Sequence, residues 1–76
     1  MQKSLIAKRS IVINGHKTSI SLEAVFWDAL HEMAKARRLT LSDLVASIDM
    51  ERKAPNLSSA IRCYLFSHHY KPVLQQ

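Results

Sequence analysis

The sequence has little of the residues that interrupt regular structure. Its 76 residues include one glycine and two prolines, which leaves little room for long loops or low-complexity linkers. A chain of this length, taken as one domain over 1–76, buries only a modest fraction of its unfolded surface when it folds alone. We therefore expect a small, regular domain that gains stability from a partner subunit.

A single cysteine, Cys63, excludes an internal disulfide framework. The chain has no run of about eighteen apolar residues and no apolar segment typical of a secretion signal. We therefore expect a cytoplasmic protein in a reducing compartment, with no membrane contact. Because Cys63 falls in a helical pattern, we interpret it as a small structural residue and not as a reactive thiol.

Acidic residues are missing from the start of the chain. Lys3, Lys8, Arg9 and Lys17 all precede the first carboxylate, Glu23, and the formal net charge is +5. Such a basic balance favours nucleic acid or an anionic membrane surface as the partner, and of the two we favour nucleic acid.

The patterns that carry catalysis or hold a metal are also missing. There is no Gly-rich phosphate loop, no Ser-His-Asp order and no pair of carboxylates placed in a cleft, so we expect neither an enzyme nor a cofactor. His68 and His69 diverge by about 100° on a helix, and we expect His68 to be buried or at an interface. Asp28, His31 and Glu32 have metal-like spacing, but a solvated helix face explains them more simply, and no metal site is assigned.

The clearest positive signal is a β-hairpin over about residues 9–22. A β-branched segment over 9–13 leads into Asn14-Gly15, the dipeptide that best supplies the two positive φ angles of a tight turn. With this turn, Ile13 faces His16, and side chains alternate between two faces. One face is then mostly apolar and carries Ile11, Ile13, Thr18, Ile20 and Leu22. The other is mostly polar and carries Lys8, Ser10, Val12, Lys17, Ser19 and Ser21.

Apolar residues at helical spacing predict three helices after the hairpin, at about 23–36, 41–50 and 57–69. Thr40 has the spacing of an N-cap for the second helix, with Asp43 as its capping-box partner. Asn56 caps the third helix, and Pro72 ends it. Trp27 extends the apolar stripe of the first helix, and we expect it to be buried in a core or an interface.

The polar-faced strand at 17–22 is expected to have an unpaired edge, and a lone hairpin is marginal in water. Antiparallel pairing with a two-fold copy covers such an edge. We therefore expect a homodimer in which folding and association are linked. The residues expected in the dimer core are Ile20, Leu22, Phe26, Leu44 and Ile48.

Two segments carry a family resemblance. Thr18-Ser19-Ile20-Ser21-Leu22-Glu23 and Leu39-Thr40-Leu41-Ser42, each leading into a helix, resemble the ribbon-helix-helix fold of the MetJ and Arc repressor superfamily. Phe26-Trp27-Asp28-Ala29-Leu30, Ile48-Asp49 and Asn56-Leu57-Ser58-Ser59-Ala60-Ile61-Arg62 are similar to short, stand-alone bacterial ribbon-helix-helix proteins. The resemblance implies an α+β fold: an N-terminal hairpin, three helices and a ribbon-helix-helix dimer whose third helix is extra.

The resemblance also implies a function and its residues. In the superfamily, strands of two subunits form an antiparallel ribbon in the major groove of double-stranded DNA. The positions that face bases are Lys17, Ser19 and Ser21, and their side chains offer only modest base discrimination. The start of the second helix contacts phosphates, which implicates Arg38, Thr40 and Leu41. We therefore expect a DNA-binding transcription regulator.

Two alternatives stay open. The strand at 9–13 either widens the ribbon of the dimer to four strands, although the groove admits two comfortably, or Lys3, Lys8 and Arg9 form an arm along phosphates. The rival function is a dimeric interaction module, antitoxin-like or an adaptor, without DNA binding. Its third helix would dock another protein, and the side chains expected to do so are Tyr64, Phe66 and Tyr70. The polar strand face would then only solvate the sheet, or Ser21 would cap the first helix.

Overall fold

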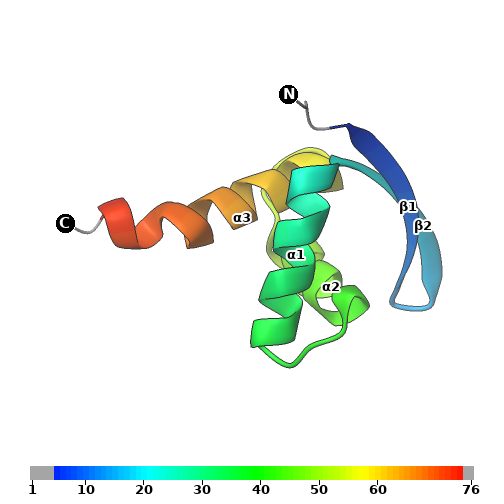
Figure 1. The fold of residues 1–76 in the computed structure, drawn as a ribbon. Helices are drawn as coiled ribbons and strands as arrows, with labels where there is room; N and C mark the ends of the chain where they lie inside the picture. Colours follow the sequence, from blue (N-terminus) through cyan, green and yellow to red (C-terminus); the bar gives the residue numbers. More distant parts are fainter. Residues whose placement is uncertain (1–4, 75–76) are drawn as a thin grey trace.

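The computed structural model describes residues 5–74, with side chains described through His68. Its elements follow the chain in the order β1 (Ile6–Ile13), β2 (His16–Glu23), α1 (Ala24–Ala36), α2 (Leu41–Glu51) and α3 (Leu57–Leu74). The two strands form an antiparallel hairpin that curves along one side of the helices, while α3 extends away from the other side (Figure 1). The structure confirms the predicted α+β fold of a hairpin followed by three helices.

The hairpin turn has the predicted conformation. Asn14 and Gly15 both have positive φ, at 51° and 82°, which matches the twist of the flanking strands. The register is also as predicted, because Ile13 pairs with His16 and Ile11 pairs with Thr18. Since register decides which face each side chain takes, the turn sets the chemistry of both faces of the hairpin.

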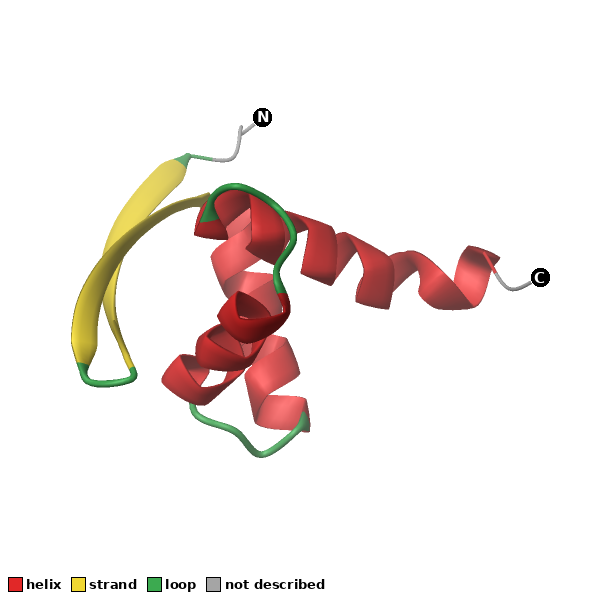
Figure 2. Cartoon of the chain, turned by 180° about the vertical axis from the view of Figure 1, so that it is seen from behind, coloured by secondary structure: helices red, strands yellow, loops and turns green. Residues whose placement is uncertain are grey.

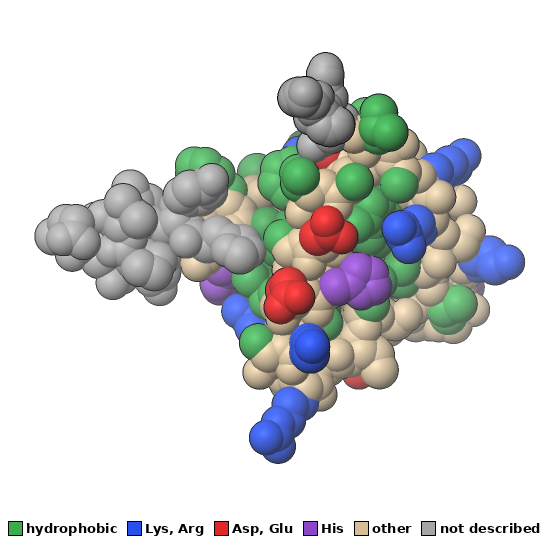
Figure 3. Space-filling view, viewed as in Figure 1, with side chains coloured by type: hydrophobic (Ala, Val, Ile, Leu, Met, Phe, Trp, Pro, Cys, Tyr) green, Lys and Arg blue, Asp and Glu red, His purple; other side chains and the backbone are tan. Residues whose placement is uncertain are grey.

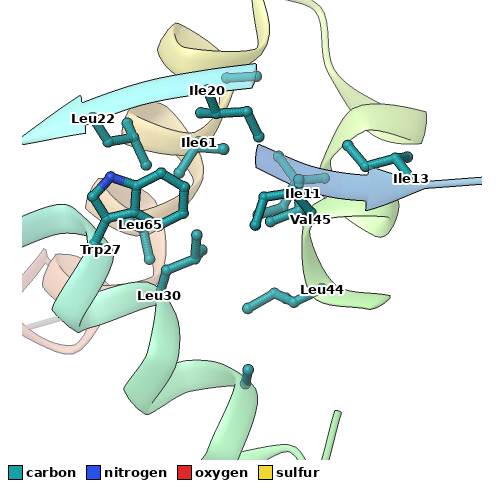
Figure 4. Close-up of a cluster of buried hydrophobic side chains, with 13 residues drawn as sticks. Ile11, Ile13, Ile20, Leu22, Trp27, Leu30, Leu44, Val45, Ile61 and Leu65 are labelled. Carbon is teal, nitrogen blue, oxygen red and sulfur yellow. The ribbon is translucent and has the colours of Figure 1, made fainter. Parts of the chain in front are cut away.

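The inner face of the hairpin shares one core with all three helices. Ile11 and Ile13 of β1 and Ile20 and Leu22 of β2 are buried, whereas Thr18 is half-buried. Their partners come from every helix. Figure 4 labels Trp27, Leu30, Leu44, Val45, Ile61 and Leu65, and the same core includes Ala34, Ile48 and Ala60. A hairpin is marginal alone, so this burial is what holds the strands in place.

Trp27 connects β1 to α1. Its side chain is buried, as expected, and its Nε1–H donates to the carbonyl oxygen of Ala7 at 2.9 Å. The guanidinium of Arg9 lies over the same ring, 5.4 Å from its centroid. One side chain therefore gives the first strand an apolar contact, a hydrogen bond and a cation–π contact.

Both predicted helix caps are present. Thr40 Oγ1 accepts the backbone N–H of Asp43 at 3.0 Å, and the Asp43 carboxylate accepts the N–H of Thr40 at 3.5 Å. Asn56 Oδ1 accepts the N–H of Ser59 at 2.9 Å. These caps satisfy donors that the first turns of α2 and α3 leave unpaired.

Two expectations about the last helix are corrected, the position of its end and the burial of His68. The helix continues to Leu74, so Pro72 does not end it; the φ of proline suits a helix, and one missing donor near the end removes one bond. His68 is exposed and lies against Tyr64, with ring centroids 4.2 Å apart. It is not buried because α3 extends beyond the helical body (Figure 1). Cys63 is exposed too, and its interpretation as a small structural residue stays a prediction.

Candidate nucleic-acid interface

The outer face of the hairpin is open to solvent. We define the outer face as three cross-strand pairs, and all six of their side chains are exposed: Lys8 with Ser21, Ser10 with Ser19, and Val12 with Lys17. The helices pack against the opposite side of the strands (Figure 2). The three predicted base-facing residues, Lys17, Ser19 and Ser21, therefore lie together on a surface that the chain leaves uncovered.

The one carboxylate of the hairpin is neutralised by α3. Glu23 accepts from Arg62 Nε at 2.9 Å and from Arg62 Nη2 at 3.4 Å. The hydrogen bond from Arg62, followed by that from its own backbone N–H, lowers the pKa of Glu23. Among the described residues, neither Lys8 nor Lys17 has an acidic ion-pair partner. In Figure 3, Lys and Arg side chains project along the side occupied by the hairpin, so the outer face has a positive, uncompensated charge.

This pairing predicts a specific loss of stability in acid. Because the folded-state pKa of Glu23 lies below its unfolded value, its contribution is present at neutral pH and disappears as pH falls through the lowered folded-state pKa. Glu23→Gln should therefore lower the melting temperature at pH 7 and flatten its decrease between about pH 5 and pH 3. The exposed Glu32 supplies the control: Glu32→Gln should keep the wild-type acid profile.

Arg9 and Lys8 belong to the sheet and not to a free arm. β1 pairs with β2 from Ile6 to Ile13. Arg9 lies on the inner-face register opposite Ile20 and reaches over Trp27, whereas Lys8 points outward. The third residue of the expected arm, Lys3, is outside the described residues.

The start of α2 is preceded by a tight connection. Arg38 has φ 59°, and two bonds close the end of α1: Arg38 N–H to the Lys35 oxygen at 3.1 Å, and Leu39 N–H to the Ala34 oxygen at 2.9 Å. This is the bond pattern of a Schellman motif, whose left-handed position favours glycine. Arg38 therefore lies just before the N-cap of α2, and its side chain is exposed.

Replacing Arg38 separates its backbone strain from its charge. Arg38→Gly should stabilise the fold by about 0.5 to 1 kcal/mol, because glycine adopts positive φ without steric cost. Arg38→Ala keeps a residue with a Cβ atom at positive φ and should not stabilise the fold. Urea denaturation measures the difference. If Arg38 contacts phosphate, both variants should weaken DNA binding equally, and a defect in Arg38→Ala alone would contradict that role.

The capping box restricts which amides of α2 remain for an anion. The N–H groups of Thr40 and Asp43 are engaged with each other's side chains. Those of Leu41 and Ser42 have no hydrogen-bond acceptor among the described residues, as expected at a helix start. The sequence predicted phosphate contacts at Thr40 and Leu41, and the free N–H of Ser42 in the first turn of α2 is a further candidate. The connection between α1 and α2 lies at the same end of the molecule as the hairpin tip (Figure 1).

Most residues predicted for a dimer core are buried within one chain. Ile20, Leu22, Leu44 and Ile48 are each no more than 3% exposed. Phe26 is half-buried and lines a shallow groove of about 420 Å³ with Arg62, Cys63, Phe66 and Ser67. Of the five, Phe26 is the one that the chain itself leaves partly exposed.

The side chains predicted to dock a protein differ in exposure. Phe66 is 61% exposed. Tyr64 is half-buried, its hydroxyl accepts a hydrogen bond from Arg37, and the Arg37 guanidinium lies 5.6 Å from the ring centroid. Tyr64 therefore fastens α3 to the end of α1. The side chain of Tyr70 lies outside those described.

The polar face of α1 is solvated. Asp28, His31 and Glu32 are all exposed, and within the described residues no three His, Cys, Asp or Glu side chains gather where they could hold a metal ion.

No helix in the described part of the chain combines the length and apolarity that crossing a membrane requires.

Comparison with known families gives one match that spans most of the chain. The family described as "Ribbon-helix-helix domain" matches residues 6–69, and the chain therefore belongs to the ribbon-helix-helix domain family. Domains of this family are non-catalytic, generally bind DNA as transcription regulators or antitoxins, and typically dimerise. Comparison with curated proteins gives no match, and neither does comparison with solved structures.

Proposed function

We propose that this protein binds double-stranded DNA through the outer face of its hairpin and acts as a transcription regulator. The observation that supports this most is the outer face itself. It is exposed along both strands and carries two lysines, and the carboxylate at the end of β2, Glu23, is paired with Arg62. A polar, positive strand surface without a helix over it fits the major groove, which admits a two-stranded β-ribbon.

We assign the contacts by chemistry. Lys17 donates to guanine O6 or N7, and Ser19 and Ser21 act as donor or acceptor at base edges. Arg38 and the start of α2 at Thr40 and Leu41 contact phosphates, which fixes position without discriminating between sequences. The positive charges of Lys8 and Arg9 add longer-range electrostatic attraction to the phosphate backbone, without a direct phosphate contact being assigned to either. Because lysine and serine lack bidentate geometry, selectivity between sequences is modest.

We also propose that two copies act together, in the bacterial cytoplasm, as a homodimer. Membership of a family that typically dimerises supports this, and so does the small size of the chain. Light scattering at several concentrations tests the proposal. It predicts twice the chain mass of 8.7 kDa, and a single-chain mass at every concentration would contradict it.

The salt dependence of binding tests DNA contact directly. Fluorescence anisotropy with a labelled duplex should show log affinity falling against log salt by about 0.9 for each phosphate neutralised. Arg38→Ala should make this slope shallower by about 0.9, the contribution of one phosphate contact. A response that is flat in salt would contradict the proposal and favour the second candidate, a protein-interaction module. The observation that favours this candidate is Phe66, 61% exposed on the groove beside Phe26.

A further inference from the structure

We propose that the hairpin of a single chain is a complete base-contacting ribbon, in which Lys8, Ser10 and Val12 of β1 contact base edges beside the residues of β2. In the superfamily, the two strands of the ribbon come from two subunits. Here one chain supplies both. The inference rests on the proposed DNA binding, and it adds a second strand of specificity residues to the site.

The register brings the two strands into one surface. Ser10 lies opposite Ser19, with Lys8 opposite Ser21 and Val12 opposite Lys17. The side chains of directly opposite residues project from the same face, with Cβ atoms about 4.5 to 5.5 Å apart. The described sheet has two strands, the width that the major groove accepts. The hairpin therefore has the width and the polar surface of a ribbon without a second chain.

The exposure of Val12 supports contact with bases. Val12 is 53% exposed at the turn end of the outer face, where it lies opposite Lys17 and follows Ser10 on the same face of β1. A β-branched apolar side chain suits a strand, but the core gains nothing from this one because it points away. The thymine methyl group is the apolar feature of the major groove, and apolar side chains contact it there. Val12 therefore fits a thymine methyl between polar contacts.

The far edge of β2 is partly covered by α3. The Ser58 hydroxyl donates to the carbonyl oxygen of Ser21 at 2.9 Å, and Arg62 holds Glu23 at 2.9 Å. In an antiparallel sheet, every second residue of a strand directs its backbone N–H and C=O away from the neighbouring strand. Ser21 is such a residue, because its carbonyl oxygen accepts from Ser58 of α3 and not from β1. A strand from a second copy would compete with α3 for this carbonyl. β1 occupies the opposite edge of β2 along its whole length.

The helical body holds β1 as well as β2. Ile11 and Ile13 are each 7% exposed, and Trp27 is bonded to the backbone of Ala7. A ribbon contacts bases well only when its strands are rigidly placed. It follows that each chain occupies its own stretch of major groove, and that a homodimer contacts two half-sites instead of sharing one.

The test uses the full chain and a duplex selected by it from a random pool. We measure the ratio of affinities for the selected and random duplexes for the wild type, Ser10→Ala, Ser19→Ala and the control Ser47→Ala, which changes an exposed serine of α2. Ser10→Ala and Ser19→Ala should each lower the ratio by about threefold to tenfold, as expected for single-bond contacts. Ser47→Ala should leave it unchanged.

A second measurement replaces each thymine of the selected duplex with uracil, which removes only the methyl group. The wild type should lose affinity, and Val12→Ser should bind both duplexes alike. If Ser19→Ala lowers the ratio while Ser10→Ala and Val12→Ser behave as wild type, the single-chain ribbon is overturned and DNA binding by β2 stands. If the wild type binds no duplex, the proposed function fails and the inference fails with it.

Discussion

Trp27→Ala should remove most of the stability of this protein. Truncating a buried aromatic typically costs about 3 to 5 kcal/mol, and a chain of this length has about 4 to 11 kcal/mol in total. Trp27 is 1% exposed, and its loss also removes the hydrogen bond to Ala7 and the ring beneath Arg9. Urea denaturation followed by circular dichroism measures the change.

Trp27→Phe is the matched control, because it keeps an aromatic ring and removes the N–H donor. It leaves the Ala7 carbonyl without this donor and should cost less than the alanine variant. Loss of one hydrogen bond is worth about 0.5 to 1.5 kcal/mol, to which the smaller ring adds. If Trp27→Ala unfolds at the wild-type urea concentration, the tryptophan does not anchor β1 and this account of the hairpin is wrong.

Lys17→Glu should weaken DNA binding by about tenfold or more, the second large effect. The substitution removes a cation from the outer face of the hairpin and places a carboxylate against the phosphates. Anisotropy at constant salt measures it. Lys53→Glu makes the same change of net charge at an exposed residue between α2 and α3. It should reduce affinity much less, and equal losses in the two variants would show that net charge, and not the outer face, determines binding.

The local features of the fold could be predicted from the sequence. Asn14-Gly15 admits few turn geometries, so it set the strand register and, through it, both faces of the hairpin. Thr40 and Asn56 cap helices through residues three positions away, and such local bonds follow from spacing alone. Trp27 lies on the apolar stripe of its helix, and its burial followed from that periodicity.

The long-range features could not be predicted in this way. Ser58 reaches Ser21 across 37 positions, and Arg62 reaches Glu23 across 39. No periodicity connects α3 with the edge of β2. Apolar periodicity predicts that Ile20, Leu44 and Ile48 are buried. It does not distinguish burial within one chain from burial against a second copy. His68 lies on the apolar stripe of α3, but α3 extends beyond the other helices, so no helix is there for this part of the stripe to pack against (Figure 1).

A backbone amide titration followed by NMR tests the central claim most directly. When a duplex is added to the labelled protein, the largest shifts should fall on outer-face residues such as Ser10, Ser19 and Ser21 and on the first turn of α2. The groove beside Phe66 should remain unchanged. Shifts confined to that groove, or no shifts at any duplex concentration, would contradict the account.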